Sequence, residues 1–207
     1  MSAAKAAARL RSRFGWGTPT IDSGPALILL SGLPGTGKSY LAAAIESRYK
    51  AVVVRSDEVR KALYAEPKYT TGENGFVYLA CYALLDQLLA DGHVVVFDAT
   101  NLQRDGRKRA RKIALNAGAP ALTLVTTAPP EVVNERLRQR AAGASESYSS
   151  DADWDIHQKL AATMEAMNNE PRLEVDTSHG LEPAMEAVGR FLRGTGNHER
   201  AAAEREA

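Results

Sequence analysis

The sequence has a single cysteine and almost no net charge, and both scarcities limit what the protein can be. Cys81 has no second cysteine to pair with, which excludes an intrachain disulfide and a cysteine-rich metal site. We expect its side chain to pack as a small apolar group. Lys and Arg number 26 against 25 Asp and Glu, a formal net charge of +1, so no overall field attracts the chain to nucleic acid or anionic lipid. A polynucleotide site would have to be a local patch of charge.

Long hydrophobic runs and internal repeats are also missing. No stretch approaches the roughly twenty apolar residues that a membrane-spanning helix needs, and we therefore expect a soluble, cytoplasmic protein. The 207 residues are enough for one α/β domain with a sizeable core.

The two ends of the chain differ from its middle in composition. Residues 2–24 are rich in Ala, Arg and Ser and contain no acid before Asp22. Such a composition occurs both in organellar presequences and in frayed lead-ins to a first strand. Residues 195–207 are polar and follow the start of a Gly-Thr-Gly break. We expect a flexible segment at 1–24, one domain at 25–194 and a tail at 195–207.

Between these ends, apolar runs rich in β-forming residues alternate with longer amphipathic stretches. The runs are residues 26–31, 51–55, 93–98, 121–126 and 173–176. This alternation predicts an α/β fold with a parallel sheet, and the continuously apolar runs indicate strands covered by helices on both faces. Ligands of such sheets lie at the carboxyl ends of the strands, so the residues just after each run are the candidates for a site.

The segment after the first run matches the phosphate-binding loop pattern G-x-x-x-x-G-K-[ST] in full. It consists of Gly32, Leu33, Pro34, Gly35, Thr36, Gly37, Lys38 and Ser39. The glycines let backbone N–H groups point inward at a phosphate, where the next helix presents the positive end of its dipole. We expect Lys38 at the β- and γ-phosphates and Ser39 on Mg²⁺. A turn that only joins strand to helix would not require this agreement of strand, loop, Lys and Ser, so the loop predicts a nucleoside triphosphate site.

Asp57 and Arg60 follow the second run. An acid at this point can take a proton from an acceptor hydroxyl, and Arg60, three residues on, shares its helical face and could hold an anionic group of the acceptor. The alternative is that Ser56 or Asp57 caps the helix that begins there. Beside a phosphate-binding loop we favour the functional role for Asp57.

Asp98 ends the third run, and Thr100 and Asn101 follow it. An apolar strand that ends in Asp beside a phosphate loop has the form of the acid that holds Mg²⁺; the alternative is a helix cap. Thr100 and Asn101 lie at the mouth of the expected site, where they could bind an acceptor or orient Asp57.

A dense basic cluster comes next, at Arg104, Arg107, Lys108, Arg109, Arg111 and Lys112. Positions 104, 107, 108 and 111 share one helical face. The cluster could contact phosphates of a nucleic acid, but a solvated basic face is the commoner explanation for such a run.

A second arginine-rich helix is expected after the fourth run, with Arg136 and Arg140 one turn apart. The small polar residues of 141–152 that follow it predict a lid. Closing this lid would bring guanidinium charge to the transferring phosphoryl group and exclude water. Ion pairs of these arginines with Glu131 or Glu135 on the surface are the alternative.

Taken in order, these motifs resemble the 5′-kinase domain of polynucleotide kinases and related P-loop kinases, a group allied to AAA-like ATPases and zeta toxins. The resemblance covers residues 26 to about 190 and rests on the phosphate loop, Asp57 with Arg60, Asp98 to Leu102 with Arg107, and Arg136 with Arg140. It implies a three-layer P-loop NTPase fold whose five-stranded parallel sheet has the order 2-3-1-4-5.

The same resemblance implies a role for each matched residue. Lys38 and Ser39 would serve ATP and Mg²⁺, Asp57 would be the general base, and Asp98 would be the strand-end acid near the metal. Arg136 and Arg140 would be the lid arginines on the phosphates, and Arg60, Thr100, Asn101 and Arg107 would lie on the acceptor side. Tyr40 stands where the family has a small hydroxyl residue, so only its backbone N–H would serve the nucleotide.

Two hypotheses of function follow. The first is an ATP-dependent kinase that transfers the γ-phosphoryl group to a hydroxyl, either a polynucleotide 5′-OH or that of a small metabolite. The second is an ATP-binding regulatory switch, or slow ATPase, that acts through a protein partner. Many P-loop ATPases carry a water-activating glutamate directly after the strand-end acid, but Ala99 occupies that place here.

Overall fold

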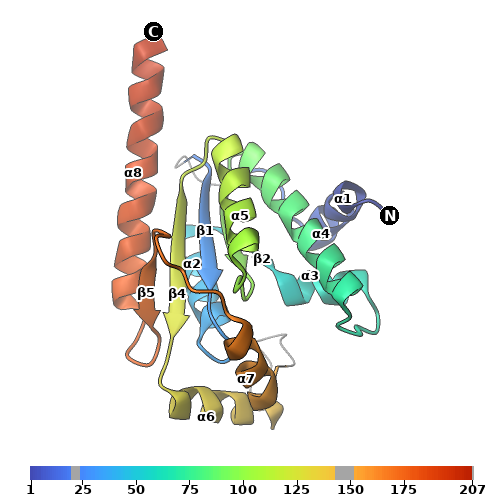
Figure 1. Ribbon diagram of the computed structural model, residues 1–207. Helices are drawn as coiled ribbons and strands as arrows, with labels where there is room; N and C mark the ends of the chain where they lie inside the picture. Colours follow the sequence, from blue (N-terminus) through green and yellow to red (C-terminus); the bar gives the residue numbers. More distant parts are fainter. Residues whose placement is uncertain (20–23, 143–151, 207) are drawn as a thin grey trace.

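Five parallel strands form one sheet in the order β2-β3-β1-β4-β5 (Figure 1). The structure, a computed structural model, describes residues 1–19, 24–142 and 152–206, with only the backbone for 195–206. The strands are β1 (Ala26–Ser31), β2 (Val52–Arg55), β3 (Val94–Asp98), β4 (Ala121–Thr127) and β5 (Leu173–Asp176). This order and the parallel pairing confirm the predicted sheet.

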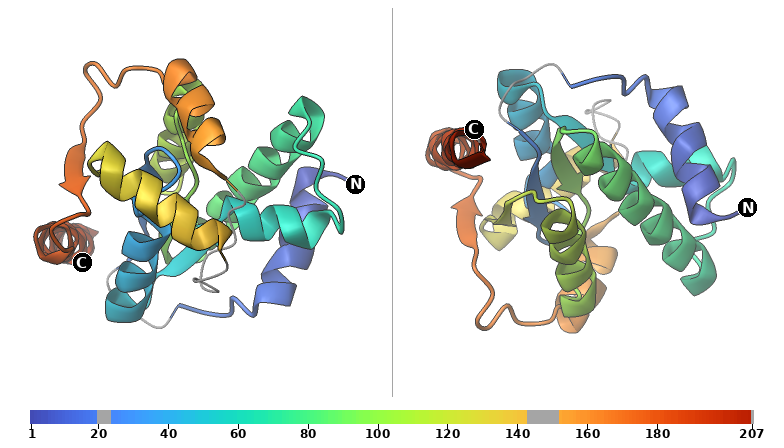
Figure 2. Two further views of the ribbon diagram at one scale, coloured as in Figure 1. Left: turned by 90° about the horizontal axis from the view of Figure 1, so that it is seen from below. Right: turned by 90° about the horizontal axis from the view of Figure 1, so that it is seen from above.

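Helices cover both faces of the sheet, which gives three layers (Figure 2). On one face lie α2 (Lys38–Tyr49) and α8 (Glu182–Glu206); on the other lie α4 (Thr71–Ala90) and α5 (Arg104–Asn116), with α1 (Ala3–Phe14) and α3 (Ser56–Leu63) beside α4. Alternation along β1 explains the two layers, because Leu27 and Leu29 pack toward α4 whereas Ile28 and Leu30 pack toward α2. All four side chains are fully buried.

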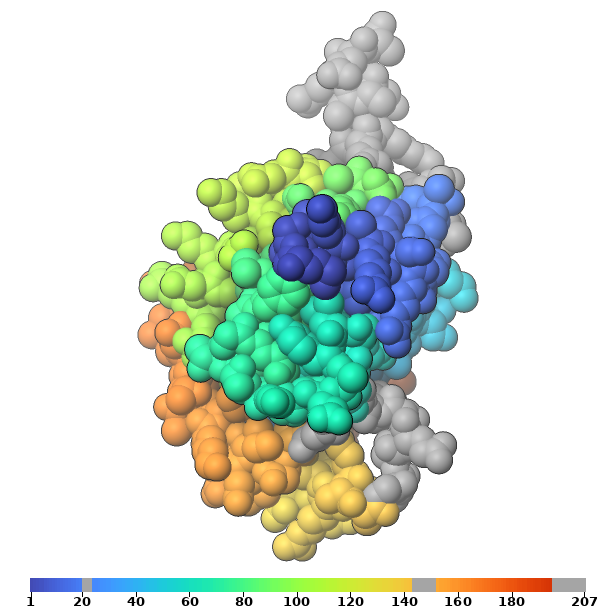
Figure 3. Space-filling view, turned by 90° about the vertical axis from the view of Figure 1, so that its right-hand side faces the viewer, coloured from blue at the N-terminus to red at the C-terminus, as the bar shows by residue number. Residues whose placement is uncertain are grey.

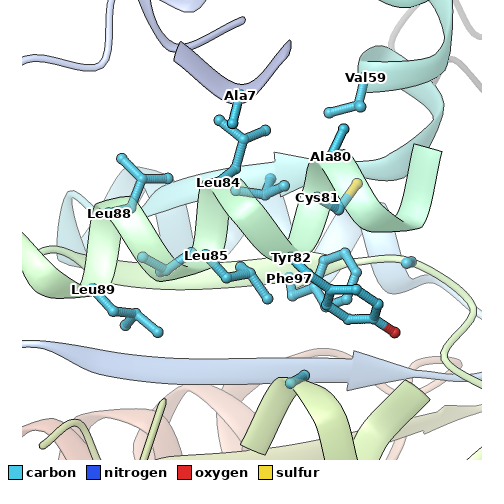
Figure 4. Packing of buried hydrophobic residues seen from close by; sticks show 14 of the residues in the cluster. Ala7, Val59, Ala80, Cys81, Tyr82, Leu84, Leu85, Leu88, Leu89 and Phe97 are labelled. Atoms are coloured by element: carbon cyan, nitrogen blue, oxygen red, sulfur yellow. The ribbon is translucent and has the colours of Figure 1, made fainter. Parts of the chain in front are cut away.

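Helix α4 supplies much of the core on its face of the sheet (Figure 4). Its leucines point both at the sheet and outward at α1, and Tyr82 lies against Phe97 of β3 with ring centroids 6.0 Å apart. Cys81 is a buried free thiol within this cluster, which confirms its expected role as an apolar packing residue. A helix that is apolar on nearly every side must be covered on nearly every side.

That requirement explains why residues 3–14 form a helix where we expected a flexible segment. Ala6, Ala7 and Leu10 of α1 are buried against α4, and Figure 4 shows Ala7 facing Leu84. In the space-filling view, α1 lies flat on the neighbouring elements (Figure 3). Gly15, with φ 69°, ends the helix in the left-handed conformation that glycine adopts without strain. The small alanine side chains let the two helix backbones approach closely.

The other end also differs from expectation. The predicted tail begins at 195, but α8 continues as a helix to Glu206 and extends past the edge of the sheet opposite the carboxyl ends of the strands (Figure 1). The division into one domain with two terminal segments stays a prediction. Within the described part of the chain, no helix combines the length and apolar character needed to cross a membrane.

Two short helices, α6 (Pro130–Ala141) and α7 (Trp154–Thr163), lie beyond the carboxyl ends of the strands (Figure 1). Most of the predicted lid, residues 143–151, lies outside the described residues. The candidate site lies at this end of the molecule, and α6 and α7, which flank the lid segment, are the parts of the lid region that can be described.

Candidate active site

The phosphate-binding loop joins β1 to α2, and three glycines with positive φ let its backbone turn back on itself. Gly32, Gly35 and Gly37 have φ values of 150°, 82° and 88°, a region in which side chains are strained. A Cβ on Gly37 would lie 2.7 Å from Thr177 Oγ1, and one on Gly35 would lie 2.8 Å from Val133 Cγ1. The glycines are therefore required both by backbone conformation and by the packing of α6 and of Thr177, just after β5, against the loop.

Three threonines support the loop from behind. Thr36 Oγ1 lies 2.7 Å from Thr126 Oγ1 at the end of β4, and Thr177 Oγ1, just after β5, donates to the backbone oxygen of Thr36 at 2.9 Å. All three are buried. These bonds fix the loop backbone before any phosphate binds, which is the preorganisation that anion binding by N–H groups requires.

Lys38, Asp98 and Asp57 form the charged centre of the site. In the register of β2 on β3, Arg55 is paired with Asp98, so Asp57, two residues later, comes to the same edge. Burial lowers the pKa of Lys38 to about 8, while the carboxylates of Asp98 and then Asp57 act to raise it. The Lys38 ammonium donates to the Leu33 backbone oxygen at 3.0 Å. The three side chains that the sequence predicted for phosphate, metal and base thus share one electrostatic environment.

Ser39 and Asp98 are the residues suited to hold Mg²⁺. Burial raises the pKa of Asp98, and Lys38 and a hydrogen bond from the Ser39 side chain counteract this rise. A hydroxyl and a carboxylate oxygen side by side fit the preference of Mg²⁺ for oxygen ligands, with the remaining positions left to phosphates and water. Among the described residues, no group of three or more His, Cys, Asp or Glu side chains is placed to hold a metal.

The N-cap position of α3 is neither Ser56 nor Asp57. Helix α3 begins at Ser56, its N-cap position is Arg55, and the Arg55 side chain makes no cap hydrogen bond. Asp57 lies in the first turn and is half-buried, at the edge of the sheet that carries the phosphate loop.

Arg60, predicted to bind the acceptor, requires correction. It is buried, and its terminal nitrogens donate to Glu73 Oε1 and Asn74 Oδ1, both at 2.8 Å. Its guanidinium carbon also lies 4.6 Å from the centroid of the Tyr69 ring. Arg60 therefore ties α3 to the start of α4, because a buried guanidinium must be paired.

Thr100 and Asn101 divide between two roles. The Thr100 hydroxyl lies 3.3 Å from Tyr78 OH and the residue is half-buried, and its contact with an acceptor stays a prediction. Asn101 is buried with φ 46°, and its Nδ2 donates to the Leu30 backbone oxygen at 2.7 Å. The prediction of acceptor binding by Asn101 is corrected to a link between β3 and β1, since its amide donor faces the core.

Arg107, also placed on the acceptor side, is wholly buried. Its Nε and Nη2 donate to the two carboxylate oxygens of Glu170 at 3.1 and 2.7 Å. Nη1 donates to the backbone oxygens of Asn101 and Leu102 at 3.0 and 2.6 Å. Hydrogen bonds from Arg107, and from Arg111, hold the pKa of Glu170 down at about 2. The assignment of Arg107 to substrate is therefore wrong: it clamps the segment after β3 to the segment before β5.

The two lid arginines of α6 also differ from each other. Arg136 donates to Thr177 Oγ1 and the Thr177 backbone oxygen, at 2.8 and 2.9 Å, and to the Gly35 backbone oxygen at 3.4 Å. The structure thus places it behind the phosphate loop rather than free to reach phosphates. The charge of Arg140, by contrast, contributes to the lowered pKa of Lys38, although less than burial does; its role on the phosphates stays a prediction.

Sequence reasoning missed two residues that contact the loop. Thr177 directly follows the fifth strand, so the rule that functional residues follow strands could have found it. His157 of α7 hydrogen-bonds the Pro34 backbone oxygen through Nδ1 at 2.8 Å and stacks on Trp154. No sequence signal pointed to it, because its place depends on how the chain returns after residue 151. The Tyr40 side chain is exposed, in keeping with a contribution through its backbone alone.

Comparisons with known proteins place the chain in a family and match its fold. A family model described as an AAA domain matches residues 27–167. An uncharacterised protein of Mycobacterium tuberculosis is 28% identical over 155 residues, which are 65% of this chain and 31% of that protein. The chain spans 31% to 34% of the length of the curated relatives it matches.

Solved structures of kinases share the fold. The APS kinase of Mycobacterium tuberculosis, solved with AMPPNP and APS, matches with a TM-score of 0.57 at 22% identity over 80% of this chain and 96% of its own. A gluconokinase of Sinorhizobium meliloti matches with a TM-score of 0.54 at 20% identity over 88% and 98%. Because the family model covers residues 27–167, most of the sequence, this chain belongs to the AAA domain family and has the fold of its P-loop kinase neighbours.

Proposed function

We propose that this protein is an ATP-dependent phosphotransferase that moves the γ-phosphoryl group of ATP to a hydroxyl of a small metabolite. The observation that carries the proposal is the convergence of Asp57 and Asp98 on Lys38 at the mouth of the phosphate loop. One carboxylate beside the metal position and a second beside the phosphate lysine are what in-line transfer to a hydroxyl needs.

The side chains then have separate tasks. As the acceptor oxygen forms its bond to the γ-phosphorus, the bond to the bridging oxygen of ADP breaks, and Asp57 takes the hydroxyl proton. The loop N–H groups, Lys38 and Arg140 stabilise the negative charge on the phosphoryl oxygens. When bound at Ser39 and Asp98, Mg²⁺ would supply further neutralisation of the β- and γ-phosphates.

The pairing of two buried arginines with acids favours a small acceptor over a polynucleotide. Arg60 and Arg107, two cations that could have bound a phosphate backbone, are engaged by Glu73 and Glu170. The chain as a whole carries a formal charge of +1, which gives little attraction for a polyanion. APS kinase and gluconokinase, whose folds resemble this one, are named for small acceptors. Phosphoryl transfer that weakens steeply with added salt would contradict the small acceptor, because polynucleotide binding releases counterions.

The proposal is tested by replacing the proposed base. Asp57→Asn keeps the size of the side chain but removes its basicity, and we expect kcat for transfer to fall about 10² to 10⁴-fold while ATP binding persists. Asp86→Asn, an exposed position on α4, is the matched control and should leave both unchanged. Transfer of labelled phosphate from ATP to a panel of sugars, nucleosides and oligonucleotides provides the assay.

Two outcomes would contradict the assignment. Undiminished transfer by Asp57→Asn would remove Asp57 from the chemistry. Turnover of ATP that no hydroxyl acceptor on the panel changes, but that a protein partner stimulates, would instead favour the regulatory switch.

A further inference from the structure

A pocket of about 430 Å³ lies on the surface between α5 and the segment that leads into β5. Arg104, Lys108 and Arg111 line it from the helix, and Asn169 and Glu170 line it from the segment. Figure 3 shows these two parts of the chain, α5 in yellow-green and the residues before β5 in orange, meeting on one side of the molecule. None of the lining residues belongs to the phosphate loop, so this is a second concave site.

The pocket wall carries an excess of positive charge. The three basic residues are spaced by four and three positions and therefore share one face of α5. Two acids, Asp105 and Glu170, also line the pocket. Arg107, buried behind the wall, already neutralises Glu170, so this acid adds little negative potential at the surface.

One nitrogen in the wall needs a hydrogen-bond acceptor. Arg111 donates through Nη2 to Glu170 Oε2 at 2.6 Å, which holds the guanidinium in place. Its Nη1 is buried and has no partner among the described residues. A buried donor of a charged group without an acceptor is costly. Arg111 lines the pocket, and a shift of its guanidinium that exposes this nitrogen would let an anionic oxygen relieve the cost.

The other two cations are free to turn toward the same ligand. Both Arg104 and Lys108 are exposed, and within the described residues their side chains have no hydrogen bond or ion pair that would hold them elsewhere. The backbone N–H of Arg104 is different, since Glu165 accepts from it at 2.5 Å. The start of α5 is thus capped, and the attraction of the pocket for an anion must come from side chains.

We propose that this pocket binds a small phosphorylated metabolite, a function distinct from phosphoryl transfer at the loop. Its volume lies within the roughly 300–1,000 Å³ range of small-molecule sites, and a guanidinium fork beside an ammonium suits a phosphate dianion. A polynucleotide is disfavoured because the other cations of α5 do not extend the site. Arg107 is buried, Arg109 lies over the Tyr82 ring, 4.7 Å from its centroid, and Lys112 does not line the pocket.

The test measures binding without turnover. Pyrophosphate is titrated calorimetrically into the full chain that has been saturated with AMPPNP and Mg²⁺, so that the phosphate loop is filled. The double variant Arg104→Glu, Lys108→Glu should weaken pyrophosphate binding at least about tenfold, since it removes two charged donors and adds repulsion. Lys112→Glu, an exposed position on α5 outside the pocket, is the matched control and should bind as the native chain does.

A second readout guards against indirect effects of the substitutions. Pyrophosphate should protect Lys108 of the native chain from amine-reactive labelling, and leave Lys112 unprotected. Binding that is absent, or that falls equally in both variants, would overturn the proposal. So would tighter binding of a single-stranded oligonucleotide that protects both lysines, which would make α5 a nucleic-acid surface. None of these outcomes depends on Asp57 or on transfer, so failure here is separate from failure of the proposed function.

Discussion

Replacing Arg107 by Met should unfold the protein more easily without removing its chemistry. Arg107 is fully buried and joins Glu170 through two hydrogen bonds of 2.7 and 3.1 Å. Met has a similar length and can fill the same space, so the main loss is the charge pair rather than volume. Breaking a buried pair from one side costs about 3–5 kcal/mol because the remaining charge is left in a poor solvent.

Two features of the surroundings place the expected cost at the lower end of that range. Glu170 keeps a second cation, Arg111, at 2.6 Å. The backbone oxygens of Asn101 and Leu102 also keep other donors, Ser31 Oγ at 3.1 Å and the Glu165 N–H at 3.2 Å. We therefore expect a loss of about 3 kcal/mol in the free energy of unfolding. For a chain of this size that lowers Tm by about 6–12 °C.

Urea unfolding followed by circular dichroism, with a thermal scan beside it, measures this loss. Arg104→Met, on the exposed side of the same helix, is the control and should shift the unfolding free energy by less than about 0.5 kcal/mol. The reasoning is refuted if Arg107→Met costs under about 1 kcal/mol while kcat/KM falls a hundredfold, because that result would return Arg107 to the acceptor.

Four further predictions concern the loop, the charged pairs and the first helix. Gly37→Ala should raise the Kd for ATP at least about tenfold, because its Cβ would meet Thr177 at 2.7 Å from a left-handed backbone; unchanged ATP binding in a fluorescence titration would contradict this. The pKa of about 8 at Lys38 means that ATP binding at pH 8.5 should take up as much as about three-quarters of a proton, measured by calorimetry in buffers of different ionisation enthalpy; no uptake would show that Lys38 is already charged. The stability that Glu170 contributes should be complete above its ordinary pKa of 4.5 and be lost as the pH falls toward 2, so acid unfolding of Glu170→Gln should depend less on pH than that of the native chain over this interval. Ala7→Asp should cost about 3 kcal/mol or more in urea unfolding, since it buries an unpaired carboxylate under α4, and a neutral result would mean that α1 does not pack there in solution.

The donor half of the proposed site follows from the sequence alone. The phosphate loop is contiguous, and its glycines, Lys38 and Ser39 are fixed by local backbone and charge requirements. Sequence reasoning could also identify Asp98 and Asp57 as candidates. Asp98 ends one apolar run and Asp57 follows another, and the carboxyl ends of parallel strands meet at one edge of the sheet. The strand order was predicted through the resemblance to P-loop kinases, and the pairing of β1 with β3 and β4 confirms it.

The tertiary structure decided which of the predicted site arginines are paired within the described part of the chain. Arg60, Arg107 and Arg140 carry the same charge and occur in similar motifs, so no local pattern separates them. What separates them is the acid across the fold, since Glu73 lies 13 residues from Arg60 and Glu170 lies 63 residues from Arg107. A guanidinium is buried in the interior only where an acid is placed to pair with it. Sequence therefore determined where the phosphate-loop motif lies, because that motif is local, and long-range packing determined which arginines are buried in pairs with acids.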